Sequence, residues 1–191
     1  GSCSVNHILA SGASDTLDAA NNYTHTDGLV NAFISVKNNL IVAAGADAGT
    51  GDIIMDGTGA QTYSVASAAA RISHLVINKT AGAVTPAVGT TDLAVWKFSL
   101  LTGSFTAPTG NFRIGGPQTG GSYTLFTHTA GTFTHNSGTV IFDPTRNSCT
   151  QYTYTVDVLT STQFYNLDAS LTYGSCSVNH ILASGASDTL D

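Results

Sequence analysis

The sequence predicts an all-β protein, and more closely a right-handed parallel β-helix (a β-solenoid) that continues through tandem repeats. Three observations lead to this prediction. Short apolar-polar alternations recur along the chain, only 9% of the residues are charged, and the opening segment Gly1–Asp18 returns unchanged at the end. Alternation with a period of two is typical of strands, and no stretch sustains the 3.6-residue period of a helix.

The alternations are four to seven residues long, and Gly, Asn, Asp or Pro closes each of them, as expected for strands and turns. The expected strands are Ala32–Val36, Asn39–Ala43, Asp52–Met55, Thr62–Val65, Leu75–Asn78, Ala94–Leu100, Asn111–Ile114, Tyr123–Thr127, Gly131–His135, Thr139–Phe142, Tyr152–Val158 and Phe164–Asp168. Only Ala66–Ile72 has fair helical propensity. It is too short to be stable as an isolated helix.

The two ends of the chain define its organisation. Gly1–Asp18 is identical to Gly174–Asp191, so the sequence consists of one repeat, residues 1–173, and the start of the next, residues 174–191. The probability that a match of this length arises by chance is negligible. We therefore expect a segment of a periodic array whose partners are the preceding and following copies of the same repeat.

A weaker similarity divides the repeat into two modules of about 87 residues, approximately 1–88 and 89–173. Four pairs of segments carry it, at offsets between 87 and 91. These pairs are Gly51–Asp56 with Gly138–Asp143, Gln61–Val65 with Gln151–Val156, His74–Asn78 with Phe164–Asp168, and Leu9–Gly12 with Leu100–Gly103.

A sandwich, a barrel and a solenoid all fit a strand-rich module with frequent turns. Two features favour the solenoid. The modules follow one another without a linker rich in Pro, Gly or charge, and the strands alternate apolar residues with Thr, Ser and Asn, as the wall of a parallel β-helix requires. A right-handed winding agrees with the usual hand of parallel crossovers. At roughly 22 to 25 residues and about 4.8 Å per coil, one repeat would advance roughly 35 Å.

Three phrases carry a resemblance to a known class of proteins: LLTGSFTAPTGNFRIGG, THTAGTFTHNSGTVIFDP and TQFYNLDASLT. They resemble the strand-turn phrases of large secreted bacterial surface proteins with right-handed β-solenoid repeats, among them adhesins and filament components. The likeness covers most of Leu93–Tyr173 and, more faintly, Asn39–Thr85. It implies the fold and an extracellular location. One departure is Asp143-Pro144, where the family phrase has Asp-Gly, as Asp56-Gly57 has here.

Composition restricts the possible partners. The net charge is -6, and the six Lys and Arg residues are scattered, so nucleic acid is not an expected partner. No apolar run approaches the length of a membrane-spanning helix. Glu is absent and most Asp residues stand at turn positions, which leaves few candidates for acid-base catalysis. We expect no enzymatic activity and no cofactor.

The three cysteines reduce to two sites per repeat, because Cys3 and Cys176 are equivalent. Cys149 and Cys176 are separated by about one turn of a solenoid, and we expect a disulfide between them. Cys3 would then pair with the equivalent of Cys149 in the preceding repeat. Buried free thiols are the alternative. A metal site is not expected, because there is no CxxC motif and no clustered His/Cys spacing.

Other side chains allow further interpretations. Histidines in threonine-rich contexts, namely His25, His128 and His135, could align into a zinc ladder but are more often single imidazoles. Recurrent Thr-x-Thr triplets resemble the ranks of an ice-binding surface, although β-propensity alone also explains them. Phenylalanines are expected in the core. Tyr152 and Tyr154 are candidates for outward contacts with another chain.

These observations favour a non-catalytic structural repeat of a long extracellular fibre, sheath or stalk at the cell surface, with lateral bundling of like fibres. The alternatives are an adhesin that binds glycans and, with less support, an ice-binding solenoid. A third possibility is a noncovalent polymer in which the repeated ends mark the joint between short subunits.

Overall fold

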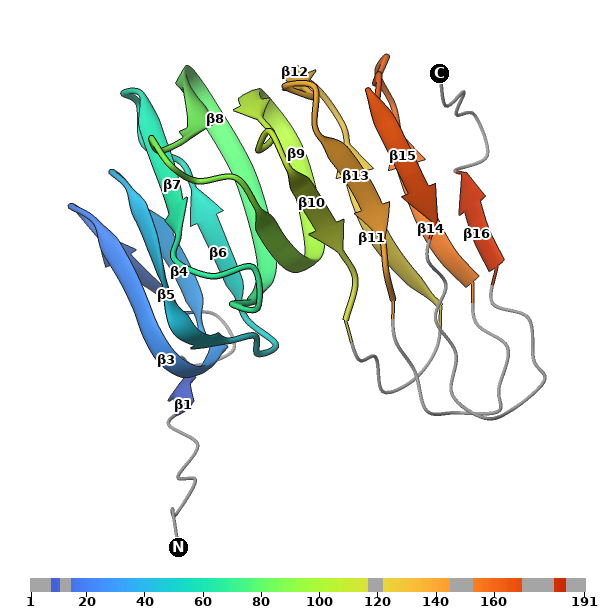
Figure 1. Ribbon diagram of the computed structural model, residues 1–191. Coiled ribbons are helices and arrows are strands. Elements are labelled where there is room, and N and C mark those ends of the chain that lie inside the picture. The colour runs from blue at the N-terminus through green and yellow to red at the C-terminus, as the bar shows by residue number, and fades with distance from the viewer. Residues whose placement is uncertain (1–7, 11–14, 117–121, 145–152, 170–180, 185–191) are drawn as a thin grey trace, which may run out of the picture.

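The computed structural model describes residues 8–10, 15–116, 122–144, 153–169 and 181–184. These residues form sixteen strands of one sheet, all of whose ladders are parallel, and no helix occurs among them. The strands lie side by side from β1 and β3 at one end to β15 and β16 at the other (Figure 1). The all-β prediction is therefore confirmed.

The strands are β1 (Ile8–Ala10), β2 (Thr16–Ala19), β3 (Tyr23–Asn31), β4 (Phe33–Val36), β5 (Leu40–Asp47), β6 (Asp52–Met55), β7 (Gln61–Val65), β8 (Ile72–Pro86), β9 (Leu93–Thr106), β10 (Asn111–Ile114), β11 (Tyr123–His128), β12 (Thr132–Thr134), β13 (Thr139–Phe142), β14 (Thr153–Val158), β15 (Asn166–Ala169) and β16 (Ile181–Ser184). The boundaries of β6, β10 and β13 coincide with the predicted ones. The stretch Ala66–Ile72 forms a turn and the first residue of β8 instead of a helix.

The ladders arrange the strands in three rows, which the chain visits in a fixed order. The first row contains β2, β4, β6, the first half of β8, the middle of β9, β11, β14 and β16. The second contains the first halves of β3 and β5, then β7, the second half of β8, the end of β9, and β12. The third contains β1, the second halves of β3 and β5, the start of β9, β10, β13 and β15.

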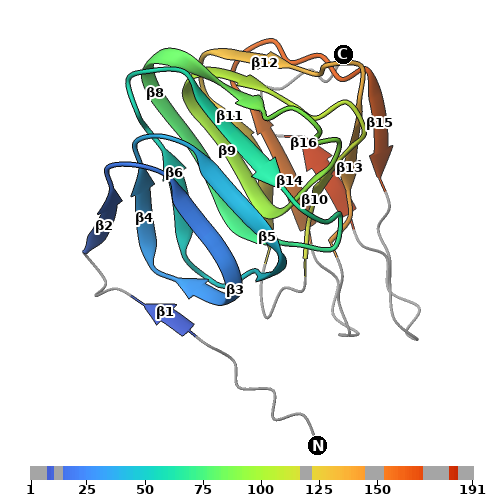
Figure 2. The same cartoon turned by 60° about the vertical axis from the view of Figure 1, so that its left-hand side comes forward.

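We use the word circuit for one passage of the chain through the three rows. The long strands β8 and β9 bend as they pass from one row to the next (Figures 1 and 2). In the third row β5 and the start of β9 are not paired directly, and residues 71 and 72 lie between them. The amide of Arg71 donates to the carbonyl oxygen of Ala46 at 3.0 Å, and Ile72 pairs with Val95, so these two residues continue the row.

Circuits differ in length. The interval from Thr16 to its partner Phe33 is little more than half the interval from Tyr123 to its partner Tyr154. The coil length expected from the sequence thus lies inside the observed range but does not describe each circuit. The additional residues of the later circuits lie between β10 and β11, between β13 and β14, and between β15 and β16, where the chain leaves the third row for the first.

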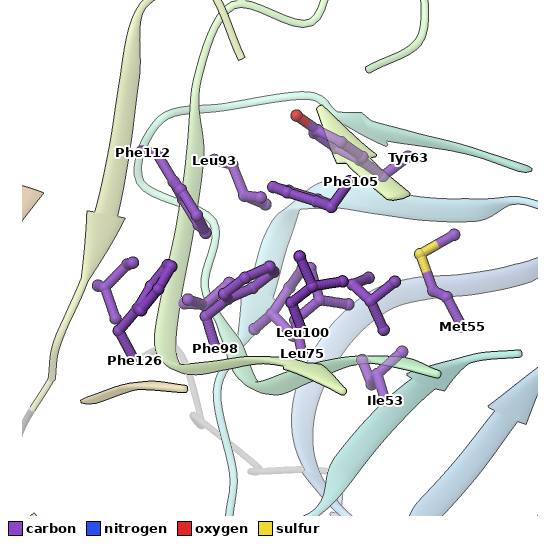
Figure 3. Close-up of a cluster of buried hydrophobic side chains, with 14 of the residues drawn as sticks. Ile53, Met55, Tyr63, Leu75, Leu93, Phe98, Leu100, Phe105, Phe112 and Phe126 are labelled. Carbon is purple, nitrogen blue, oxygen red and sulfur yellow. The ribbon is translucent and has the colours of Figure 1, made fainter. Parts of the chain in front are cut away.

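Aromatic rings from all three rows meet in the core. Phe98 of the first row, Phe105 of the second and Phe112 of the third have centroid separations of 4.7, 5.7 and 5.2 Å around the triangle (Figure 3). In the next circuit Phe126 contacts Phe133 at 5.6 Å. These phenylalanines are at most 9% exposed, which confirms their predicted place in the core. The side chains between the rows are therefore the interior of the molecule.

Glycines make one of the bends possible. Gly82, Gly103 and Gly131 lie where successive circuits pass from the first row to the second, with φ of 71°, 94° and 99°. A Cβ at Gly131 would lie 2.0 Å from the carbonyl oxygen of Gly103 in the circuit before it. Glycine is required here both for the left-handed backbone and for the close approach of neighbouring circuits.

Candidate functional site: the polar outer faces of the sheet

Three polar side chains form a hydrogen-bonded chain on the outer face of the first row. Asp52 of β6, His74 of β8 and Ser99 of β9 belong to three successive circuits. The Nδ1 atom of His74 lies 3.0 Å from Asp52 Oδ1, and its Nε2 atom lies 2.8 Å from Ser99 Oγ. A hydrogen on Nδ1 satisfies both contacts, because Asp52 then accepts and Ser99 donates to Nε2.

This order of carboxylate, imidazole and hydroxyl is the order of a catalytic triad, in which the imidazole activates a serine nucleophile. Acyl transfer further requires donors aimed at the developing oxyanion. Ser99 pairs with Val76 on one side and Thr127 on the other, so its main chain is part of a continuous ladder. We therefore interpret the three side chains as a clip that joins three circuits through their outer faces.

A buried lysine forms a second polar cluster at the bend between the first and second rows. Lys79 is 1% exposed, and its ammonium group donates to the carbonyl oxygens of Gly57 and Gly59 and to Oε1 of Gln61. Three acceptors match its three hydrogens, so the buried charge is fully hydrogen-bonded. Burial lowers the pKa of Lys79, and the nearby Asp56 carboxylate opposes this change.

Hydroxyl side chains follow one another along the outer face of the second row. Thr62 pairs with Thr85, and Thr106 pairs with Thr134. The pairing of Val84 with Phe105 joins the two pairs into one series. Beside this series, Ser104 pairs with Thr132, two residues away along the strands. Neighbouring hydroxyls are thus spaced about 4.8 Å across the strands and about 7 Å along them.

The predicted histidines lie in separate places. His25 is buried, with Nε2 2.9 Å from the carbonyl oxygen of Gly28. His128 is also buried, and its Nδ1 lies 2.6 Å from Thr162 Oγ. His135 stacks on Tyr165 with ring centroids 5.5 Å apart. Among the residues that the structure describes, no three His, Cys, Asp or Glu side chains gather as metal ligands.

The hydroxyl of Thr162 determines which ring nitrogen of His128 carries the hydrogen. Thr162 Oγ donates to the carbonyl oxygen of Thr160 at 3.1 Å, so it accepts from Nδ1 of the imidazole. Burial lowers the pKa of His128 from its ordinary value. This histidine therefore favours the neutral form in the folded protein.

Two predictions about outward and covalent contacts have different outcomes. The prediction that Tyr154 faces outward was wrong, because its side chain is fully buried. It shares the parity of Val156 and Val158, which are buried on the same strand, so the alternation itself places it in the core. Cys3, Cys149, Cys176 and Tyr152 lie outside the described residues, and the disulfide stays a prediction.

Comparison with known proteins yields no relative: no protein-family model, no curated protein and no solved structure matches the chain. The described residues include no helix of the length and apolarity needed to cross a membrane.

Proposed function

We propose that the chain is one repeat, followed by the start of the next, of a long extracellular fibre built as a right-handed parallel β-helix. Each circuit through the three rows is one coil of that helix, and the right hand follows the general preference of parallel crossovers. The repeat is non-catalytic and serves as a structural unit of a cell-surface filament, sheath or stalk.

One observation carries the proposal: the repeated tripeptide Ile-Leu-Ala is a strand at both ends of the chain. In β16, Leu182 pairs with Tyr154; in β1, the equivalent Leu9 pairs with Val30. Both partners are buried, at 0% and 2% exposure. A single Ile-Leu-Ala strand between two copies could therefore pair with β14 of one and β3 of the next without reversing the alternation of inner and outer positions.

Such a junction supports a covalent array because no separate joining element is needed. Ladders continue from copy to copy, so that strand edges are left open only at the ends of the fibre. The low content of charge reduces repulsion between fibres and favours lateral bundling.

Electron microscopy and fibre diffraction of the full-length protein test this function. We expect unbranched filaments with a meridional reflection at about 4.8 Å, which is the strand spacing along the axis of a β-helix. Compact particles of the size of one repeat, without this reflection, would exclude the fibre.

The series of hydroxyls on the second row supports one second candidate, an ice-binding surface. Regular hydroxyls on a flat sheet can hold water in ordered positions. The test is inhibition of ice recrystallisation by the intact chain, with the variants Thr106→Lys and Thr106→Val. Loss of inhibition with Lys and its retention with Val would support this function, because Val keeps the shape of Thr. Equal inhibition by both variants, or none by the parent chain, would reject it. The glycan-binding alternative has lost one of its two candidate outward tyrosines, Tyr154.

A further inference from the structure

Segments that are related in sequence lie in different rows of the sheet. Gly51–Asp56 contains β6 of the first row, whereas its counterpart Gly138–Asp143 contains β13 of the third row. A module that wound through a whole number of circuits would place both segments in the same row. The module therefore does not contain a whole number of circuits.

The displacement can be counted in row positions, three to each circuit. After β6 the chain passes one position in β7, one in the third-row segment that ends at Ile72, two in β8, three in β9, and one each in β10, β11, β12 and β13. β13 is therefore eleven positions beyond β6. Eleven positions are three circuits and two thirds of another.

Two further matches give the same displacement. From β7 to β14, which carry Gln61–Val65 and most of Gln151–Val156, the chain again advances eleven positions, from the second row to the first. From the first half of β8 to β15 the advance is also eleven, from the first row to the third. The stretch 159–165 is not a strand, but Phe164 contacts Phe133 of β12 with ring centroids 5.8 Å apart, which gives this stretch the second-row position between β14 and β15. The stretch 66–71, also not a strand, ends in the third row after β7 and is eleven positions earlier.

The shortest match does not share this spacing. Leu9 in β1 and Leu100 in β9 are thirteen positions apart, and residues 11 and 12 of that match lie outside the described residues. One of the longer matches, Gln61–Val65 with Gln151–Val156, also shares a buried tyrosine, which the shortest match lacks. Tyr63 of β7 and Tyr154 of β14 each lie two residues before the valine that closes the matched segment, and both are 0% exposed although they belong to different rows.

The two ends of the chain show the doubled displacement. β1 lies in the third row and pairs with β3, whereas β16, which carries the same tripeptide, lies in the first row and pairs with β14. Between them the chain advances twenty-two positions, which is twice eleven, or seven circuits and one third.

We propose that successive repeats of the fibre are turned by one row with respect to each other. This inference rests on the proposed function. Each repeat would rotate by about a third of a turn and advance about 35 Å, and each module would rotate by about two thirds of a turn. The relation is a screw with three steps, so three repeats return every side chain to its original row.

This geometry determines the lateral interaction surface. The outer face of the second row, with its threonine series, points to one side in one repeat and to each of the other two sides in the next two. The partner that fits such a surface is a second copy of the fibre. It can approach from any of three sides and meets the same side chains on each side at intervals of about 105 Å, which is three repeats of about 35 Å.

Helical reconstruction of full-length filaments by cryo-electron microscopy tests the inference. The decisive reading is the row occupied by the strand equivalent to β1 in the following repeat, because this reading does not depend on the gradual twist of the coils. We expect it in the row of β4, β6 and β14 of the preceding repeat. A strand found in the row of β1, β10 and β13 of the preceding repeat would overturn the inference and leave the fibre intact.

A crystal structure of the 191-residue chain supplies a second measurement that does not require filaments. β6 and β13 in different rows, eleven positions apart, would support the non-integral module, and β6 and β13 in one row would overturn it. Failure of the proposed function has a different signature, namely a full-length protein that forms no filament, even though β6 and β13 occupy different rows.

Discussion

Replacement of Phe98 by alanine tests whether the three rows enclose a packed core. The ring is 1% exposed and lies within 4.7 to 6.3 Å of four other phenylalanine rings, measured between centroids. Loss of a buried phenylalanine side chain costs about 3–5 kcal/mol, which includes the cavity that it leaves. Because the neighbouring rings come from all three rows, we expect Phe98→Ala to lie near the middle of this range, at about 4 kcal/mol.

Urea unfolding at about 25 °C, followed by the fluorescence of the single tryptophan, Trp96, measures this loss. The tryptophan is two residues from the substitution and reports the same circuit. Leu101→Ala is the matched control, since Leu101 lies on the same strand but is 37% exposed. We expect the control to lose less than about 1 kcal/mol. A loss below about 1 kcal/mol for Phe98→Ala as well would refute the packing of rings between the rows.

Three further perturbations test other parts of the structure. Gly131→Ala should destabilise the chain by more than about 2 kcal/mol, because the left-handed backbone and the 2.0 Å approach to the Gly103 oxygen both oppose a Cβ. Gly89→Ala is the control for the backbone cost alone, since Gly89 has φ of 87° but a Cβ there would have no atom within 4 Å. Equal losses of unfolding free energy for the two variants in urea would refute the close approach at Gly131. Because the pKa of His128 is lowered in the folded protein, the unfolded chain binds more protons than the folded one at a pH just below the ordinary value of 6.5, and stability should fall as the pH is lowered through that value. His128→Gln should weaken this pH dependence in urea titrations, whereas the control His135→Gln should not. An unchanged pH dependence in His128→Gln would contradict the lowered pKa of His128. Ser99 should not react with a fluorophosphonate probe, since its main chain is part of ladders on both sides, which engage the amides that would otherwise bind an oxyanion; covalent labelling that disappears in Ser99→Ala would overturn the non-catalytic interpretation.

Local patterns predicted many of the strands because alternation and turn residues act over a few positions. β6, β10 and β13 are short apolar stretches that each directly follow a glycine, and their boundaries agree with the prediction. β3 was missed, since Thr24, Asp27 and Gly28 interrupt its apolar pattern. The ladder with β5 supplies the hydrogen bonds that hold this segment extended, and such tertiary pairing overrides weak local propensity.

The polar clip could not be predicted from local sequence. Asp52, His74 and Ser99 are far apart along the chain. Only the ladder register shows that His74 lies opposite Asp52 and that Ser99 lies two residues beyond Lys97, the partner of His74 in the next circuit. Lys79 was equally hidden, because a scattered lysine is normally a surface residue and its three acceptors come from a bend of the preceding circuit. Since the longest circuit is nearly twice as long as the shortest, such contacts cannot be inferred by counting residues.

The mass of the intact polypeptide tests the central claim most directly. The full-length protein is isolated without proteolysis and run on a denaturing gel with and without reductant. A covalent array of repeats predicts a chain many times heavier than the 19.6 kDa of this segment, with a mass that reductant does not lower. A species close to that single-segment mass under both conditions would contradict the array and would identify the repeated ends as the joint of a noncovalent polymer.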